Sequence, residues 1–157
     1  MRKRLITTTQ KDRPLPDAEW LDLENLAEVE LTSEDPAHPI ESALLPDGGS
    51  GWRAAQPGEQ TIRVLFTRPL QIGRISIEFV ECSIERTQEF VLRWVAHEEQ
   101  FAREIVRQQW NFSPSGATVE TEDYRVDLTA VSVIELTINP DTSGGEARAS
   151  LSRLRLA

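Results

Sequence analysis

The chain has 157 residues, a formal net charge of −9, 39% hydrophobic residues and 27% charged residues. This length suits one domain that buries a core without disulfides, and the composition excludes collagen-like, coiled-coil and wholly disordered chains. Its apolar runs are too short to span a bilayer, and its acidic balance disfavours a general role in coating nucleic acid. We therefore expect one globular domain with no membrane segment and no nucleic-acid partner.

Charge is distributed unevenly near the start of the chain. Residues 1–13 hold five basic and one acidic side chain, whereas residues 14–50 hold ten acidic and no basic side chains. Residues 1–17 are polar, contain two prolines and lack periodicity, which predicts a flexible segment ahead of a single domain at residues 18–157. We interpret the acidic stretch that follows as a feature that confers solubility.

Compartment is predicted from the first residues and from cysteine usage. No apolar stretch follows the basic start, as a signal peptide requires, and the single cysteine, Cys82, cannot form a disulfide within the chain. The sequence therefore predicts a cytoplasmic protein.

The first strand is predicted from residue 27, where Val29 and Leu31 alternate with acidic residues. Residues 18–26 before it fit either one helical turn or an extended segment. Residues 34–51 carry three prolines and a glycine cluster, which predicts a long loop with one helical turn at residues 40–44.

Seven further segments alternate apolar and polar residues with a period of two, as half-buried strands do. They are residues 61–66, 74–80, 89–95, 103–112, 119–128, 131–139 and 147–156. A helix over residues 87–109 is the one rival, and the period-two spacing of Phe90, Leu92 and Trp94 favours strand, turn and strand instead. Eight strands without a long amphipathic helix predict an all-β fold, an antiparallel β-sandwich or jelly roll.

The order of these features resembles the discoidin, or coagulation factor type C, family. The resemblance rests on PIESALLPDG at residues 39–48, SGWRA at 50–54, QTIRV at 60–64 and IGRISI at 72–77, and on two C-terminal strands, VIELTI at 133–138 and ASLSRLRL at 149–156. It covers residues 27–157. It implies the galactose-binding-like jelly roll, whose loops at one end bind sugars, lipids or proteins and which is rarely catalytic by itself.

The chain departs from this family at two places. Members that hold calcium have an Asp-Gly loop and a glutamate in the last strand; here Asp47 and Gly48 are present, but Arg153 stands at the glutamate's place. A cation beside an arginine meets Coulomb repulsion, which argues against calcium. Secreted members are commonly closed by a disulfide, which one cysteine cannot form.

A narrower stretch, residues 52–64, is similar to the N-terminal domain of the eukaryotic single-strand-break repair scaffold, which has the same fold. This resemblance implies a protein-interaction or scaffold role as an alternative function. In that alternative a partner adds a strand at an outer sheet edge, and Arg63, Arg74 and Arg93 are exposed to steer it.

Side chains for catalysis or for metal binding are sparse. His38, His97 and Cys82 are the only histidines and cysteine, too few for a closed zinc site. Glu120, Glu122 and Asp123 supply paired carboxylates, but their alternation with other residues indicates a solvated strand face on which nothing holds a proton. We therefore predict no enzyme, no catalytic residue, no metal site and no cofactor, and retain an enzyme built on this acidic cluster as the least favoured alternative.

A sugar site needs a flat aromatic ring and planar groups that hydrogen-bond neighbouring hydroxyls. The candidate ligand-binding residues are His38, Arg53, Arg107, Trp110 and Asn111. Trp110 fits either this surface or the core beneath a loop, whereas Trp52 and Trp94 are predicted to be core residues. The sequence thus predicts a non-catalytic binding module for a carbohydrate-like or other polar ligand at loops at one end of a jelly roll.

Overall fold

The computed structural model describes residues 20–46 and 49–157. The predicted flexible segment, residues 1–17, and the pair Asp47 and Gly48 lie outside the described residues. The described elements are α1 (Leu23–Leu26), β1 (Ala27–Leu31), α2 (Glu41–Leu44), β2 (Trp52–Pro57), β3 (Gln60–Val80), β4 (Arg86–Ala96), β5 (Arg103–Phe112), β6 (Val119–Asn139), β7 (Arg148–Leu151) and β8 (Arg153–Leu156).

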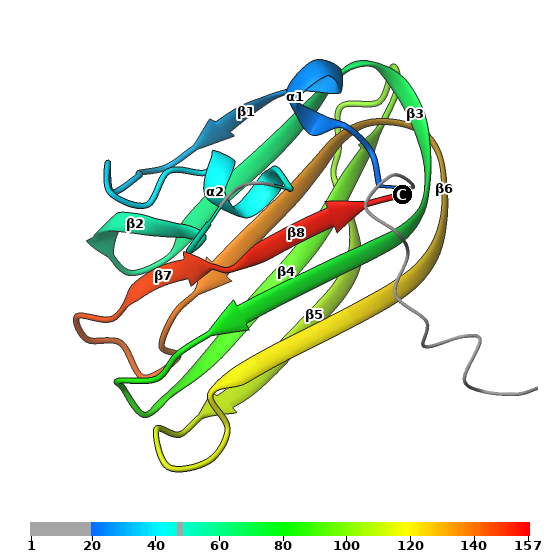
Figure 1. The fold of residues 1–157 in the computed structure, drawn as a ribbon. Coiled ribbons are helices and arrows are strands. Elements are labelled where there is room, and N and C mark those ends of the chain that lie inside the picture. Colours follow the sequence, from blue (N-terminus) through cyan, green and yellow to red (C-terminus); the bar gives the residue numbers. More distant parts are fainter. Residues whose placement is uncertain (1–19, 47–48) are drawn as a thin grey trace, which may run out of the picture.

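Two long strands, β3 and β6, join the two layers of a sandwich. They pair antiparallel at residues 60–65 with 133–138 and again at 74–80 with 119–125, and between these stretches the register shifts three times. Both strands bend at that point and pass from one layer to the other (Figure 1). The strand order is β1-β3-β6-β4-β5, with β8 on the other half of β3 and a separate β2–β7 pair. The predicted all-β antiparallel β-sandwich is confirmed.

The core lies between the layers because alternate side chains of each strand point inward. Ile62 and Val64 from the first half of β3, and Ile77 and Phe79 from its second half, are at most 1% exposed. Phe90 of β4 lies opposite, with its ring centroid 5.1 Å from that of Phe79. These are the inward faces that the period-two pattern predicted.

The strand boundaries differ from the prediction in four places. Predicted strands 61–66 and 74–80 are one strand, β3, and 119–128 and 131–139 are one strand, β6, because strand pairing resumes across each bend. In the bend of β6, Ala130 has a φ of +55°. The predicted strand 147–156 breaks at Ser152, whose N–H donates to the carbonyl of Glu78. β2 was missed because its partner, β7, lies about ninety residues away in the chain.

The helical expectations have clear outcomes. The helical turn predicted at residues 40–44 is α2, and the helix rival at 87–109 is wrong because β4 and β5 pair there as a hairpin. The described residues before β1 contain both predicted alternatives, an extended segment and a helical turn. In the extended part, the Leu21 N–H donates to the Leu156 carbonyl, and the helical turn α1 follows. Across the described ranges, no helix has the length and apolarity to span a membrane.

Candidate functional site

The small β2–β7 sheet presents arginine side chains at the loop end of the sandwich. Trp52 pairs with Leu151 and Arg53 with Ser150. Trp52 and Leu151 face the core and are at most 1% exposed, so Trp52 is a core residue as predicted. Since neighbouring residues of a strand face opposite ways, Arg53 and, on β7, Arg148 lie exposed on the outer face.

His38 is brought beside Arg53 by the loop after β1. The Arg53 N–H donates to the His38 carbonyl at 3.2 Å, and the Arg53 carbonyl accepts from Asp35 at 2.9 Å. The Trp52 indole N–H anchors the same loop by donating to the Ser33 carbonyl at 3.2 Å. The imidazole Nδ1 of His38 lies 3.3 Å from the Ser50 hydroxyl. Two of the five predicted site residues are therefore adjacent.

A hollow of about 230 Å³ lies over this face of the β2–β7 sheet. Its walls come from the loop after β1, from β2 and β7, and from the loop between β3 and β4. The lining residues are His38, Ser50, Trp52, Arg53, Val80, Glu81, Ser83, Ile84, Arg148, Ser150, Leu151 and Ser152. We call this cavity the arginine hollow.

The charge of the arginine hollow is positive, although the chain as a whole is acidic. Arg53 and Arg148 make no side-chain hydrogen bond or ion pair with any residue in the described ranges. The one lining carboxylate, Glu81, is already engaged, because Arg86 Nε donates to it at 2.9 Å. Burial by itself would raise the pKa of Glu81, but the hydrogen bonds from Arg86 and from the Ser83 and Ile84 backbone outweigh it and lower the pKa. The hollow thus offers two uncompensated guanidinium groups to a ligand.

Asn111 lies in a second hollow, of about 400 Å³, at the same end of the sandwich. Its side-chain oxygen accepts a hydrogen bond of 2.6 Å from the Thr87 hydroxyl. Arg86 lines this hollow as well, and its guanidinium carbon lies 4.9 Å from the centroid of the Phe112 ring. The Glu81–Arg86 pair therefore lies where the two hollows meet.

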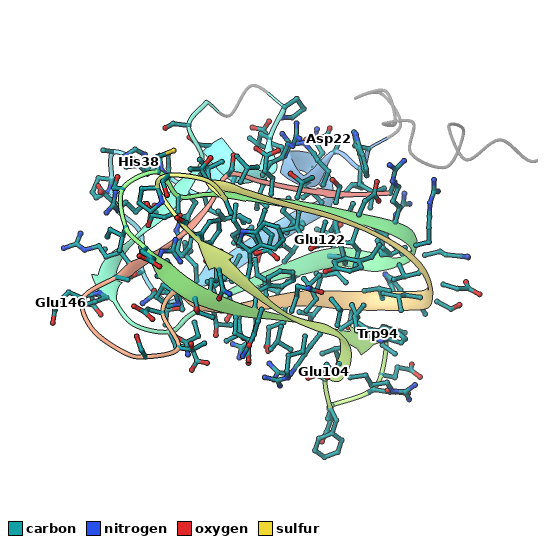
Figure 2. The ribbon with its side chains drawn as sticks, turned by 90° about the horizontal axis from the view of Figure 1, so that it is seen from below. Asp22, His38, Trp94, Glu104, Glu122 and Glu146 are labelled. Carbon is teal, nitrogen blue, oxygen red and sulfur yellow. The ribbon has the colours of Figure 1, made fainter. Side chains whose placement is uncertain are left out.

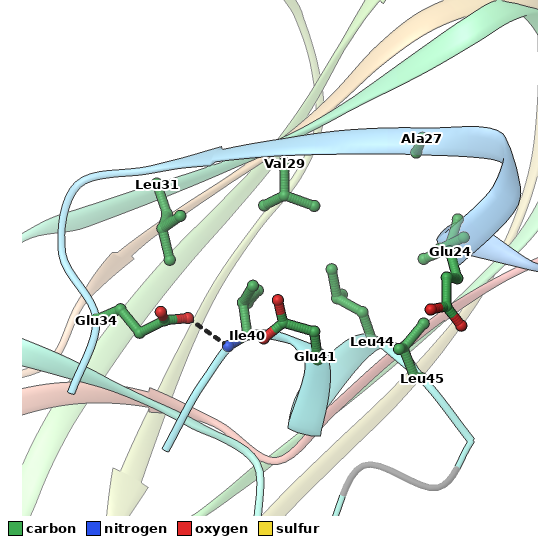
Figure 3. A pocket seen from close by; sticks show the side chains of 10 residues that line it. Glu24, Ala27, Val29, Leu31, Glu34, Ile40, Glu41, Leu44 and Leu45 are labelled. Carbon is green, nitrogen blue, oxygen red and sulfur yellow. Dashed lines mark hydrogen bonds between the residues drawn. The ribbon is translucent and has the colours of Figure 1, made fainter. Parts of the chain in front are cut away.

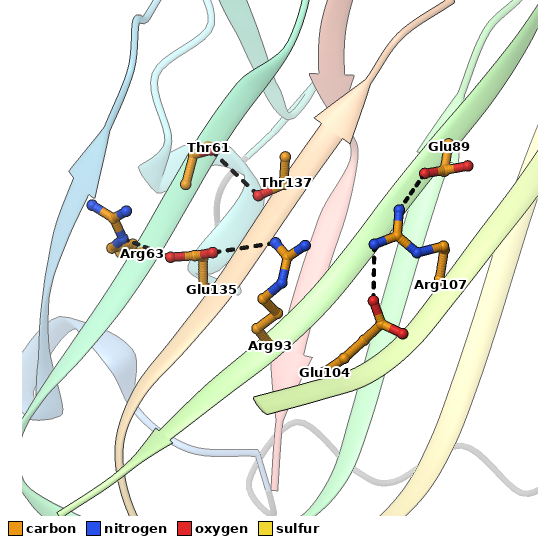
Figure 4. A network of polar contacts seen from close by, with 8 residues as sticks. All are labelled: Thr61, Arg63, Glu89, Arg93, Glu104, Arg107, Glu135 and Thr137. Carbon is orange, nitrogen blue, oxygen red and sulfur yellow. Dashed lines mark hydrogen bonds and ion pairs between the residues drawn. The ribbon is translucent and has the colours of Figure 1, made fainter. Parts of the chain in front are cut away.

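Arg107 lies elsewhere, on the outer face of the five-stranded layer (Figure 4). Its guanidinium donates to Glu89 at 2.6 Å and to Glu104 at 2.9 Å. Hydrogen bonds from Gln109 and Arg107 lower the pKa of Glu89. Arg107 is thus paired with carboxylates and separate from the two hollows at the loop end.

The three arginines expected to steer a partner differ in exposure. Arg63 and Arg93 lie on that same outer face and share Glu135, at 2.7 and 3.5 Å. The prediction that Arg74 is exposed is wrong, since it is 3% exposed. Its Nε donates to Asp123 at 2.9 Å, and the Trp20 ring covers it at 5.2 Å.

Trp110 faces the space between the layers, where several polar side chains gather. It is half-buried against the core, and its indole N–H has no hydrogen-bond partner among the described residues. The same holds for both carboxylate oxygens of Glu120 and for the hydroxyl of Tyr124. Trp94 is likewise half-buried, with Arg103 5.7 Å from its ring centroid, and it lies across the molecule from His38 (Figure 2).

The prediction that the carboxylates of residues 120–123 lie on a solvated strand face is wrong for Glu120. Glu120 is 1% exposed, and its burial, together with the charge of Glu122, raises its pKa to about 7, although the nearby Gln88 amide lowers it slightly. Burial also raises the pKa of Glu122. Asp123 lies on the opposite face with Arg74. The strand therefore separates Asp123 from Glu120 and Glu122, which share its inward face.

Comparison with known proteins finds likeness in structure. No family model matches the chain, and no curated protein matches its sequence. A pectin-binding carbohydrate-binding module matches with a TM-score of 0.60 and 15% identity, over 84% of this chain and 90% of that one. The CBM32 of AlyQ, in complex with 4,5-unsaturated mannuronic acid, matches with a TM-score of 0.60 and 16% identity, over 85% of this chain and 95% of that one. The family 32 module of C. perfringens NanJ, in complex with galactose, matches with a TM-score of 0.60 and 16% identity, over 87% of this chain and 96% of that one.

The chain has the galactose-binding-like fold. The resemblance seen in the sequence is thereby confirmed at the level of the fold. Within this galactose-binding-like sandwich, Arg153 bonds Glu78 at 3.1 Å. In the part of the chain that the structure describes, no three His, Cys, Asp or Glu side chains are placed to share a metal ion.

Sequence reasoning missed Arg148 and Ser150 of the arginine hollow. Their alternation with Ala149 and Leu151 places them on the outer face of a strand, which was a usable signal. The partner strand β2 was not predicted, so nothing in the sequence placed Arg148 beside Arg53.

Proposed function

We propose that this galactose-binding-like domain is a non-catalytic carbohydrate-binding module whose ligand is a sugar that carries a carboxylate. Solved modules of the same fold support the sugar: one binds pectin, and two are in complex with 4,5-unsaturated mannuronic acid and with galactose. The arginine hollow supports the site, since it lies at the loop end and holds the predicted residues His38 and Arg53.

One observation carries the preference for an acidic sugar: Arg53 and Arg148 have no partner among the described residues and line one hollow. A guanidinium presents its donors in a planar fork that matches a carboxylate. In a chain of net charge −9, two uncompensated cations on one small sheet form a local site for an anion. A neutral sugar would leave both guanidiniums without a counter-charge.

The remaining lining suits the rest of a sugar ring. Hydroxyl groups of Ser50, Ser83 and Ser150 and the imidazole of His38 can exchange hydrogen bonds with sugar hydroxyls. Ile84 is 44% exposed and Val80 39%, and they offer an aliphatic surface to the C–H face of a ring. Trp52 is 1% exposed, so no stacking ring is available there and the arginines must supply much of the affinity.

The test is calorimetric titration of the full chain with galacturonic acid oligomers and with neutral galactose oligomers of equal length. We expect the acidic oligomers to bind more tightly and to lose affinity as sodium chloride rises, because salt screens the ion pairs. R53Q and R148Q should each weaken binding about tenfold or more, the usual loss for a hydrogen bond to a charged group.

The matched control is R63Q, which removes an arginine already paired with Glu135 outside the hollow. It should leave the affinity unchanged. Equal binding by R53Q, R148Q and the unmodified chain would show that the ligand does not use this hollow. Preference for the neutral oligomers would retain a sugar module but reject the carboxylate.

A further inference from the structure

The loop after β3 separates two hollows that adjoin at the loop end of the sandwich. Ile84 lines the arginine hollow, whereas Glu85, the next residue in the chain, lines the hollow of about 400 Å³ that contains Asn111, which we call the asparagine hollow. Consecutive Cα atoms are about 3.8 Å apart, and the Arg86–Glu81 ion pair joins the two walls at 2.9 Å. The two hollows are therefore close enough to hold neighbouring units of one oligosaccharide.

The charge of the asparagine hollow is negative. Glu85 and Asp141 line it, and its one lining cation, Arg86, is already paired with Glu81. Glu85 is exposed and makes no ion pair with any residue in the described ranges. Asp141 accepts hydrogen bonds from the Ser143 hydroxyl at 2.7 Å and from the Ser143 backbone N–H at 3.0 Å, and these lower its pKa. The two adjoining hollows therefore have opposite charge.

Uncharged donors and acceptors make up much of the remaining lining of the asparagine hollow. The Thr87 hydroxyl donates to the Asn111 side-chain oxygen at 2.6 Å, and the Asn111 amide nitrogen donates to no described residue. Ser113 and Thr142 add hydroxyl groups. Amides and hydroxyls can both donate to and accept from the hydroxyls of a sugar. This lining suits an uncharged sugar unit, whereas a ligand carboxylate would meet two like charges.

A trough of about 350 Å³ between β1 and α2 is a poorer place for a second sugar unit. Val29, Leu31 and Leu44 point into it, so its surface is largely aliphatic (Figure 3). It also shares no lining residue with either hollow of the loop end. An oligosaccharide that starts in the arginine hollow therefore extends into the asparagine hollow.

We propose that the ligand is a mixed oligosaccharide, in which a uronic-acid unit in the arginine hollow is joined to an uncharged sugar unit in the asparagine hollow. This inference rests on the proposed function, because it takes the arginine hollow as the site of the carboxylate. The opposite charges set the order of the units: the carboxylate lies beside Arg53 and Arg148, and the unit beside Glu85 and Asp141 carries none. A second carboxylate on the ligand therefore reduces affinity.

Calorimetric titration of the full chain with one disaccharide in several charge states tests the proposal. The ligands are digalacturonic acid, each of its mono-methyl esters and its dimethyl ester, because esterification removes a charge and keeps the rings. We expect one mono-methyl ester to bind tightest, about threefold tighter than the diacid, as for an exposed charge pair. The dimethyl ester should bind about tenfold more weakly than that mono-methyl ester. Binding of the diacid as tight as that of both mono-methyl esters, or tighter, would overturn the proposal.

Removing the two carboxylates of the asparagine hollow tests the source of this preference. E85Q combined with D141N retains an acceptor for Ser143 and should bind the diacid and the better mono-methyl ester equally. The matched control, E28Q combined with E30Q, makes the same change in net charge on exposed residues of β1 and should retain the threefold preference. A preference that survives E85Q with D141N, or that disappears equally in the control, contradicts the proposal.

N111A separates failure of this inference from failure of the proposed function. It should bind the better mono-methyl ester about threefold more weakly, the usual loss for a neutral hydrogen bond. It should bind the monosaccharide galacturonic acid unchanged, because a single unit occupies only the arginine hollow, and this also shows that the variant is folded. R53Q should weaken binding of both ligands. A loss in R53Q without one in N111A would retain the acidic-sugar site and reject the second unit; no loss in either variant would reject the proposed function as well.

Discussion

Arg86 and Glu81 form an ion pair of 2.9 Å at the junction of the two hollows. The side chain of Arg86 is 1% exposed and that of Glu81 is 16% exposed. The Arg86 guanidinium also donates to the Pro140 carbonyl at 2.6 Å and to the Gln88 side chain at 3.1 Å. One buried cation thus ties the loop after β3 to the loop after β6, and it keeps the Glu81 carboxylate from neutralising the arginine hollow.

Replacing this cation is predicted to be costly. R86M leaves Glu81 and the Pro140 carbonyl without their donor, and breaking a buried pair costs about 3–5 kcal/mol of unfolding free energy. Urea denaturation measures the loss. R63M is the control, because Arg63 is 49% exposed and an exposed pair is worth about 0–1 kcal/mol. Equal losses in the two variants would contradict the structural role of Arg86.

Glu120 makes stability depend on pH. Its pKa is about 7 in the folded chain against 4.5 when unperturbed, so the folded state holds the proton more tightly. The protonated carboxyl therefore contributes its full share of the unfolding free energy below pH about 4.5, and this contribution is lost as pH rises through about 7. E120Q removes the ionisation, so relative to the unmodified chain it should gain stability as pH rises, by roughly 3 kcal/mol at most above pH about 8.

Urea midpoints at several pH values measure this difference. The control is E146Q, which alters an exposed carboxylate in the loop before β7 (Figure 2). A constant offset between E120Q and the unmodified chain across the pH range would show that Glu120 does not titrate there.

Gly51 allows β2 and β7 to approach each other. Its φ is +91°, and a Cβ there would lie 2.5 Å from the Leu151 carbonyl oxygen. G51A should therefore lower thermal stability and, by moving Trp52 and Arg53, weaken sugar binding. G49A is the matched control: φ is +89° but nothing lies within 4 Å, so only the left-handed strain of about 1–2 kcal/mol applies. Similar melting temperatures for the two variants would rule out the close approach.

Substitutions of Trp110 and Arg53 are predicted to have different effects: the first on unfolding free energy and the second on sugar affinity. W110A removes a half-buried side chain that packs on the core and should lower unfolding free energy by about 3 kcal/mol. R53Q changes an exposed side chain and should alter affinity with little effect on stability. Calorimetry of unfolding and of titration measures both. If W110A keeps full stability but loses sugar binding, Trp110 contacts the ligand and does not act as a core residue.

Local periodicity in the sequence determined the fold class. Alternation such as that of Ile75, Ile77 and Phe79 fixes which side chains face the core, because neighbouring residues of a strand face opposite ways. The helical turn α2 and the hairpin of β4 and β5 follow from such local patterns. The core position of Trp52 was instead predicted from the family resemblance. They depend on neighbours a few residues apart, which a sequence displays directly.

Only the tertiary structure decided which distant residues meet. Arg53 and Arg148 share a hollow because β2 pairs with β7, and Arg107 stands apart because its side of β5 faces outward to Glu89. Glu120 looks solvated in sequence, yet the opposing layer covers it and raises its pKa. Pairing across about ninety residues and burial by a second layer are set by the whole sandwich, so no local pattern encodes them.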